Sequence, residues 1–166
     1  MDSVGVVSIA KWRAGTAQGG SGQSNGGVAS ETNGTSAARA RVLAITDRCW
    51  KCRAKVRGVV GVLVDTSEGP GFVSFTEVAD ALACSTDSRT LAARGIGALR
   101  HRDSPGIQGG YVSNGCLECD ELVGRILLDD LLDEHLRNGG TYAQLDTGLA
   151  VHLPPPGAEP SLLRTA

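Results

Sequence analysis

The feature that most constrains this chain is a pair of Cys-x-x-Cys motifs that lie far apart in the sequence. The first runs from Cys49 to Cys52 and the second from Cys116 to Cys119. A separation of three positions lets one tight turn direct two thiolates toward the same point, and two such turns facing each other form a tetrahedral cage of sulfur atoms. The chain is therefore expected to fold so that two remote turns meet.

We expect this cage to hold one zinc ion, because zinc readily accepts four thiolates in tetrahedral geometry. The 63 residues from 53 to 115 separate the motifs, and closing a loop of that length costs about 3.7 kcal/mol. Structural zinc contributes on the order of 10–16 kcal/mol in small domains, which outweighs that cost. Four sulfur ligands leave no open position for water or substrate, so the expected role of the zinc is structural.

Three other uses of paired cysteines remain as alternatives to zinc: disulfide bonds, a redox-active dithiol and an iron–sulfur cluster. A thioredoxin-type redox site needs only one motif and places its reactive cysteine at the start of a helix, whereas both motifs here adjoin β-like sequence. Disulfides are rare in the reducing cytoplasm. Cytoplasm is the expected location, because the apolar run at 4–10 is too short and poorly flanked for a secretory signal.

The length and composition favour one domain between two tails. The chain has 166 residues, of which 41 % are hydrophobic, enough for one compact core. We expect a flexible low-complexity tail at 1–40, a zinc-ribbon domain at 41–153 and a Pro-rich tail at 154–166, because the tails hold too little apolar surface to offset the entropy of ordering. No stretch reaches the ~20 apolar residues that span a membrane, so no membrane partner is expected.

The domain is expected to be α+β, with antiparallel β-hairpins and one to three short helices. Runs rich in β-branched residues at 42–46 and 56–64 predict two strands that flank the first cysteine motif. Residues 96–102 and 110–113 predict a second hairpin, joined by the turn-forming segment 103–106. This second hairpin leads directly into Cys116.

A helical insertion is expected at about 74–94. Ser74 and Glu77 have the spacing of a capping box, and the apolar positions that follow predict a helix at 75–83. A second short helix is expected at 88–94.

After the second motif, the pattern predicts a strand at 122–126 and then a helix at 127–137. That helix carries its apolar residues on one face and ends at the Asn-Gly-Gly sequence of 138–140. A last edge strand is expected within 142–153.

Charged residues gather beside both cysteine motifs. Five basic residues surround the first motif: Arg48, Lys51, Arg53, Lys55 and Arg57. Acidic residues follow the second motif: Glu118, Asp120, Glu121, Asp129, Asp130, Asp133 and Glu134. We expect pairing between these two sets, and compensation of the formal −2 charge of a four-thiolate zinc site. Contact with phosphate is the alternative use of the basic residues, although a net charge of −2 provides no global attraction for nucleic acid.

The order of several residues around the motifs carries a resemblance. In sequence these residues are Cys49, Trp50, Lys51, Cys52, Arg100, Ser104, Tyr111, Asn114, Cys116, Cys119 and Gly124. The pattern resembles a family of bacterial split zinc-ribbon proteins to which no activity is assigned. The resemblance implies a zinc ribbon and no specific function.

Two positions depart from the pattern of that family. Where the family usually has Gly directly after the second motif, this chain has Asp120, and where the family has aromatic residues after Gly124, it has Arg-Ile-Leu-Leu at 125–128. Asp adopts left-handed backbone angles more readily than most residues. We therefore expect Asp120 to adopt the conformation that the Gly provides.

Two functions are considered from these patterns. The first is a small zinc-binding protein that acts as a binding or adaptor module, with a protein as the expected partner and its oligomeric state left open. The second is a DNA-binding protein that uses the helix-turn-helix-like segment at 76–94. That segment holds Arg89 and Arg94 against Glu77, Asp80 and Asp87, which is a weak electrostatic footprint for DNA.

An enzyme is not expected. His101, His135 and His152 are scattered along the chain, and no spacing brings a base and a nucleophile together. Cys84 has no neighbouring His or basic cluster to activate it, so we expect it to be a small buried apolar residue.

Overall fold

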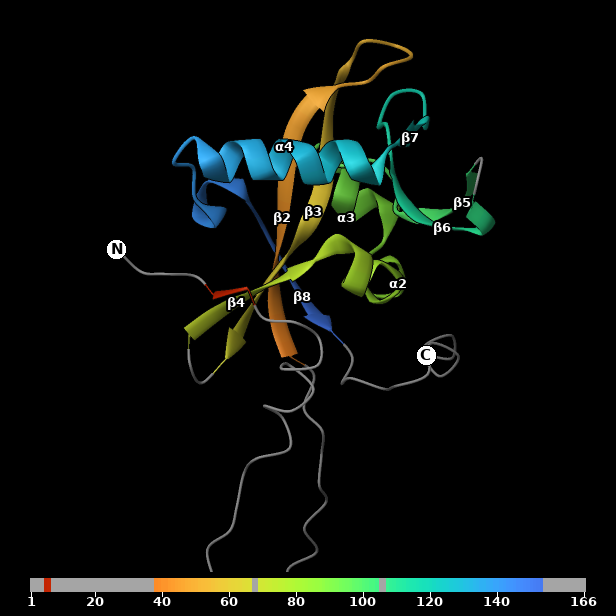
Figure 1. The fold of residues 1–166 in the computed structure, drawn as a ribbon. Coiled ribbons are helices and arrows are strands. Elements are labelled where there is room, and N and C mark those ends of the chain that lie inside the picture. Colours follow the sequence, from red (N-terminus) through yellow and green to blue (C-terminus); the bar gives the residue numbers. More distant parts are fainter. Residues whose placement is uncertain (1–4, 7–37, 67–68, 105–106, 154–166) are drawn as a thin grey trace, which may run out of the picture.

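The computed structural model describes residues 5–6, 38–66, 69–104 and 107–153. Within these ranges the chain forms a five-stranded sheet of order β1-β4-β3-β2-β8 and a three-stranded sheet of order β5-β6-β7 (Figure 1). Neighbouring strands are antiparallel, except that β1 and β4 are parallel. The expected α+β class, with antiparallel sheets and short helices, is confirmed.

The elements have the following bounds. The strands are β1 (Gly5–Val6), β2 (Ala38–Arg48), β3 (Lys55–Thr66), β4 (Gly69–Ser74), β5 (Arg100–Ser104), β6 (Ile107–Gly115), β7 (Leu122–Val123) and β8 (Asp146–Leu153). The helices are α2 (Phe75–Ser85), α3 (Ser88–Ala92), α4 (Arg125–Arg137) and the 3-10 helix η1 (Tyr142–Leu145).

Strands β2 and β3 form the centre of the larger sheet, and they contain both of the strands predicted around the first motif. Strand β3 is buried almost continuously from Val56 to Val64 because helices cover both faces of the sheet. A strand with two covered faces needs apolar residues at successive positions rather than at alternate ones. The β-branched run of β3 meets that need.

Two hydrophobic cores lie on opposite faces of the larger sheet. Val42 and Ala44 of β2 face the core that contains α2 and α3, whereas Leu43 between them faces the core that contains α4. This alternation follows from the two-residue period of a strand. Figure 1 shows α4 crossing β2 and β3 on one side of the sheet. The core on the α4 side also includes one cysteine from each motif, Cys49 and Cys116.

Helix α2 begins where the capping-box pattern predicts. The backbone N–H of Ser74 donates a hydrogen bond to the Glu77 carboxylate at 3.3 Å, which satisfies an amide that a helix start leaves unpaired. The helix runs to Ser85, slightly beyond the predicted end. Helix α3 has only five residues, and its first turn is capped by Asp87, whose carboxylate accepts from the backbone N–H of Thr90 at 2.9 Å.

The strand predicted at 122–126 is shorter than expected. Strand β7 contains only Leu122 and Val123, and α4 begins at Arg125 after Gly124, its N-cap residue. The helix starts early because that register places Leu128 and Leu132 against the sheet, where both are buried. Gly139, with a φ of 80°, follows the end of the helix, as the Asn-Gly-Gly signal predicts.

The last predicted strand is divided into two elements. Tyr142–Leu145 forms the 3-10 helix η1, and β8 then alternates between buried and less buried positions at the edge of the sheet beside β2. The division follows from a local cap, because the backbone N–H of Thr141 donates to the side chain of Gln144 at 2.8 Å.

The second hairpin is confirmed with a later start. Strand β5 begins at Arg100, and Ile96 pairs only through an isolated bridge to Arg57 of β3. Strand β6 delivers the chain into Cys116 as predicted. Part of the predicted turn, residues 105–106, lies outside the described residues.

The predicted tails lie almost wholly outside the described residues. Ala38 to Ala40 belong to β2, so the larger sheet includes the last residues of the range expected as an N-terminal tail. Gly5 and Val6 form β1, which pairs with β4. Each helix among the described residues is too short or too polar to cross a membrane.

Candidate metal centre

The two cysteine motifs form turns with the same pattern of backbone hydrogen bonds. In the first turn, residues 49–54, the N–H of Cys49 donates to the carbonyl of Ala54 at 2.8 Å, and the N–H of Arg53 donates to the carbonyl of Cys49 at 2.9 Å. In the second turn, residues 116–121, the equivalent bonds join positions 116 to 121 and 120 to 116, both at 2.8 Å. The second motif thus repeats the local structure of the first.

Each turn has a left-handed residue directly after its second cysteine. Arg53 has a φ of 63° and Asp120 a φ of 55°, and they are the only non-glycine residues with positive φ among the described residues. The conformation expected for Asp120 is confirmed. The left-handed residue reverses the direction of the chain. This reversal allows the N–H of the first cysteine of the turn to donate to the carbonyl five positions later.

The two turns bring the four sulfur atoms together. The Sγ atoms of Cys49 and Cys119 are 3.7 Å apart, as are those of Cys52 and Cys116, and all four lie within 4.8 Å of one another. The first pair lies in the turn between β2 and β3, and the second lies in the turn between β6 and β7. The four cysteines therefore form a group that could hold a metal ion.

The sulfur spacing fits a single tetrahedral ion. A zinc–sulfur bond of about 2.3 Å places the sulfur atoms of a regular tetrahedron about 3.8 Å apart, close to the observed 3.7 Å. A disulfide requires a separation of about 2.05 Å, and all five cysteines of the chain are free. Both of these 3.7 Å contacts join cysteines of different turns, so an ion at this position would link the two turns.

Backbone amides point at the sulfur atoms in both turns. The N–H of Cys52 donates to Cys49 and lowers the pKa of the Cys49 thiol to about 7. In the same way, the N–H of Ala54 donates to Cys52, and the N–H of Glu121 donates to Cys119. Amide donors stabilise a thiolate more than a thiol, so the turns favour the form of cysteine that binds metals.

The metal-free sulfur cluster opposes complete ionisation. The N–H of Ala54 lowers the pKa of Cys52, but burial and the neighbouring thiols outweigh that bond and raise the pKa to about 12. Several thiolates at such short distances repel one another unless a cation lies between them. A cation bound between the sulfur atoms would therefore stabilise the fully ionised cluster.

Asn114 fixes the second turn against the first hairpin. Its side-chain amide is buried and bonds the backbone of Val59 in β3, accepting from the N–H at 2.7 Å and donating to the carbonyl at 3.0 Å. Asn114 lies two residues before Cys116. This link between β6 and β3 positions the second cysteine pair opposite the first.

Two arginines hold the conformation of the second turn. Arg102 donates to the carboxylate of Asp120 at 2.5 Å and to the carbonyl of Ser113 at 2.7 Å, and Arg100 pairs with the other carboxylate oxygen of Asp120. Gly115 leaves room for this close approach, because a Cβ atom there would lie 2.2 Å from the Arg102 guanidinium and displace it. Burial lowers the pKa of Arg102, so the adjacent carboxylate is an important partner for it.

The turns also contact each other through side chains at the surface. Lys51 pairs with Glu121 at 2.6 Å, and the indole N–H of Trp50 donates to the carbonyl of Leu122 at 3.3 Å. Both bonds start in the first turn; one reaches Glu121 at the end of the second turn, and the other reaches Leu122 at the start of β7. They are solvent-exposed, and pairs of this kind contribute little to stability.

The expected pairing between the basic and acidic sets is largely absent. Of the five basic residues, only Lys51 forms an ion pair among the described residues. Arg57 instead donates to the carbonyl of Arg94 at 3.1 Å. The acidic residues of α4 do not take part, because that helix lies across the sheet and its acidic face points to solvent.

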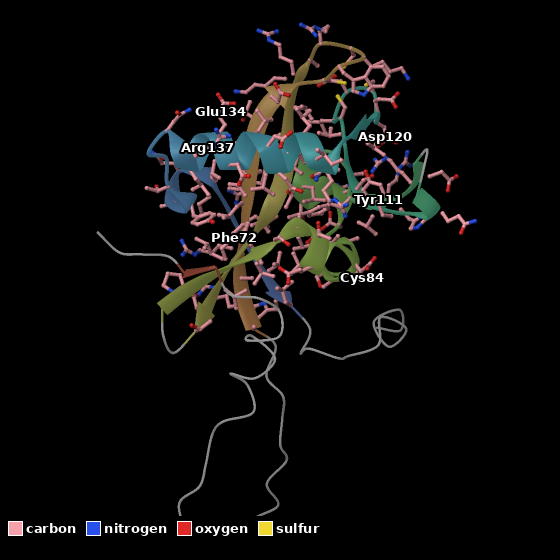
Figure 2. The ribbon with its side chains drawn as sticks, viewed as in Figure 1. Phe72, Cys84, Tyr111, Asp120, Glu134 and Arg137 are labelled. Carbon is pink, nitrogen blue, oxygen red and sulfur yellow. The ribbon has the colours of Figure 1, made fainter. Side chains whose placement is uncertain are left out.

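The other candidate residues lie apart from the cysteine cluster. Cys84 is exposed on α2 (Figure 2), so the expectation of a buried residue is wrong. His101 and His152 are exposed on β5 and β8. His135 lines an open hollow of about 390 Å³ beside the end of α4, where its Nε2 atom lies 3.1 Å from the carbonyl of Thr141.

Sequence reasoning missed Arg102, which contributes to the site by holding Asp120. The available signal is that Arg100 and Arg102 are two positions apart on one strand and therefore share a face. Comparison with family models, curated proteins and solved structures finds no match for this chain.

Proposed function

We propose that the four cysteines bind one structural zinc ion and that the resulting domain is a binding module. The observation that supports this most directly is the spacing of the sulfur atoms, 3.7 Å between partners from different turns, which fits one tetrahedral ion. A cluster of several iron and sulfide atoms would occupy more space between the cysteines than a single ion. Zinc is the metal that four thiolates in this geometry most commonly hold.

A structural role follows from the position of the cage. Four thiolates complete the coordination of zinc and leave no site for a substrate. Cys49 and Cys116 are 2 % and 1 % exposed and belong to a hydrophobic core. The ion would cross-link the larger sheet to the smaller one, through residues 64 and 70 positions apart in the chain.

Metal analysis of the full-length chain tests the zinc site. Protein purified without chelator is expected to contain about one zinc per chain, and Cys116→Ser is expected to lose both the zinc and much of the cooperative unfolding transition. Cys84→Ser is the matched control, because Cys84 is exposed and remote from the cluster, and it should retain one zinc. A folded wild-type protein without bound metal would contradict the proposal.

Cobalt substitution adds a test of geometry. Co²⁺ in a tetrahedral site of four thiolates gives intense visible absorption, whereas octahedral Co²⁺ absorbs weakly. The wild-type chain is expected to give the tetrahedral spectrum, and zinc is expected to displace the cobalt because it binds such sites more tightly.

The alternative DNA-binding segment at 76–94 receives less support. Helix α3 has five residues and is about 7.5 Å long, which is short for a recognition helix in a major groove. Arg94 donates to the carbonyl of Thr147 at 3.0 Å, and Leu91 is buried in the core below. The segment acts mainly as a cover for one face of the sheet.

A further inference from the structure

The tip of the β2–β3 hairpin carries an exposed tryptophan beside unpaired cations. Trp50 is 66 % exposed, and only the edge of its indole is fixed, through the bond to the carbonyl of Leu122. Tryptophan is usually well buried because of its large apolar surface. A tryptophan held at one edge with most of its surface in solvent is available to stack on another flat group.

Besides Lys51, three basic residues lie within five positions of Trp50 at this tip. Arg48, Arg53 and Lys55, named here the tip cations, are exposed and make no ion pair in the ranges that the structure describes. Figure 2 shows nitrogen-tipped side chains extending from this end of the hairpin into solvent. The stretch 48–57 contains 5 basic residues and no acidic one, in a chain with a net charge of −2. The basic character is therefore local and concentrated at the tip.

Lys51 is not one of the tip cations, although it lies between the two cysteines of the motif. Its ammonium group pairs with the Glu121 carboxylate at 2.6 Å, so this cation faces the second turn. The tip cations form no such pair among the described residues, which leaves them for an external anion.

We propose that the β2–β3 tip binds single-stranded DNA, with the tip cations on successive phosphates and Trp50 stacked on a base. Cations that alternate with an exposed aromatic ring are the usual elements of a single-strand binding surface. A duplex keeps its base faces stacked and would leave the indole unused. The proposed contacts are to phosphate groups and to the face of one base, which DNA and RNA share, so the ribose hydroxyl adds no specific contact for RNA.

This inference rests on the proposed zinc site, because the site fixes the turn that presents the four side chains. Arg53 adopts its left-handed conformation within that turn, and Trp50 and Lys51 lie between the two cysteines. Loss of the metal would release the tip from β7. The zinc content of each sample therefore has to be measured alongside DNA binding.

The first experiment measures binding of the zinc-loaded, full-length chain to a labelled single strand of about 15 pyrimidine nucleotides by fluorescence anisotropy. Three phosphate contacts predict that log K falls with log salt concentration with a slope of about −2. The triple variant Arg48→Gln, Arg53→Gln, Lys55→Gln is expected to remove most of this slope and to weaken binding at least tenfold at low salt.

A matched control removes the same charge elsewhere. The triple variant Arg39→Gln, Arg89→Gln, Arg137→Gln alters three exposed arginines on β2, α3 and α4. It is expected to bind within about threefold of the wild-type chain. Equal loss in both triple variants would show that net charge alone governs binding and would overturn the inference.

Trp50 provides a test that net charge does not affect. Trp50→Ala is expected to weaken binding by about 5- to 150-fold, the range of one base stacked on an aromatic ring, and to leave the salt slope unchanged. Trp50→Phe is expected to recover part of the loss, because a smaller ring still stacks. Unchanged affinity in Trp50→Ala would exclude the stacking contact.

Two further measurements, binding of other nucleic acids and zinc content, distinguish single-stranded DNA binding from the alternatives. Duplex DNA and single-stranded RNA of the same length are expected to bind no more tightly than single-stranded DNA, and tighter binding of either overturns the assignment. A folded chain that contains one zinc but does not bind the single strand at 50 mM salt, about the lower end of the usual range, overturns this inference alone. A folded chain without zinc contradicts the proposed function instead.

Discussion

The side-chain amide of Asn114 replaces a neighbouring strand for Val59. Both backbone groups of Val59 that face away from β2 bond this amide, at 2.7 and 3.0 Å. Strand β4 cannot supply these bonds, because it pairs with β3 only from Gly61 onward. One side chain therefore completes the edge of one sheet and anchors the other, next to the second cysteine pair.

Replacement of Asn114 by Ala should be strongly destabilising. The change leaves a buried N–H and a buried carbonyl of Val59 without partners, which costs about 2–6 kcal/mol for the two groups. Urea unfolding of the zinc-loaded protein measures the loss. Asn138→Ala, at an exposed position after α4, is the control and should change the free energy of unfolding by less than about 0.5 kcal/mol. Equal effects of the two variants would contradict this role of Asn114.

Gly58 permits the close contact between β3 and α4. A Cβ atom at this position would lie 2.6 Å from the Cδ2 atom of Leu128, a buried residue of α4. Gly58→Ala is therefore expected to destabilise the fold by about 1–3 kcal/mol. Leu128→Ala alone should cost about 2–5 kcal/mol, but the double variant should cost clearly less than the sum, because the new methyl group fills part of the space. Additive costs in a double-mutant cycle would argue against direct contact.

Glycine at the two equivalent left-handed positions should have opposite effects. Arg53→Gly removes the cost of a left-handed side chain and makes no change to an ion pair, so it should stabilise the zinc-loaded fold by about 0.5–1 kcal/mol. Asp120→Gly relieves the same strain but leaves Arg102, whose side chain is 10 % exposed, without its carboxylate. A net loss of about 1–3 kcal/mol is expected. Thermal unfolding of both variants with excess zinc gives the comparison, and the same sign for both would contradict it.

Zinc affinity should rise with pH. Only thiolates bind the ion, and the pKa of Cys52 in the metal-free cluster is about 12 whereas that of Cys49 is about 7. At neutral pH Cys52 is therefore protonated, and zinc binding must release its proton. As the pH falls, protons compete with the metal and the apparent affinity decreases. Titration of metal-free protein with zinc in a weakly buffered indicator solution should show acidification, and pH-independent binding would refute this account.

Thiol accessibility should report the state of the cluster. The chain has 5 cysteines, and Cys84 is exposed and remote from the other four. With zinc bound, one thiol per chain is expected to react rapidly with a maleimide reagent, and after a chelator all five should react. Cys84→Ser should abolish only the rapid reaction. Rapid modification of several thiols in the zinc-loaded protein would be inconsistent with the cage.

The cysteine turns were predictable because their signal is local. Two thiols three positions apart, between β-branched runs, already define a turn between strands, and Asp120 could be assigned a left-handed backbone from its place after the motif. The capping box of α2 is equally local, because Ser74 and Glu77 lie within one turn of helix. These features depend on few distant contacts.

The features that sequence reasoning missed depend on tertiary context. The short β7 and early start of α4 follow from the position of Leu128 over Gly58, which no local pattern reveals. The failure of the basic and acidic sets to pair follows from the direction in which α4 crosses the sheet. Cys84 is a different case: it lies two positions after Leu82, about 200° around the helix from this buried residue, so the helical pattern already placed it on the solvent side.

The long separations between partner cysteines have a kinetic consequence. Cys49 and Cys119 are 70 positions apart, and Cys52 and Cys116 are 64 apart, so both hairpins must form and dock before four sulfur atoms can surround one ion. Contacts that form after the rate-limiting step of folding leave its speed unchanged and slow the reverse reaction. Zinc at this junction would chiefly lower the rate of unfolding. It would prolong the lifetime of the native state and leave the rate of folding almost unchanged.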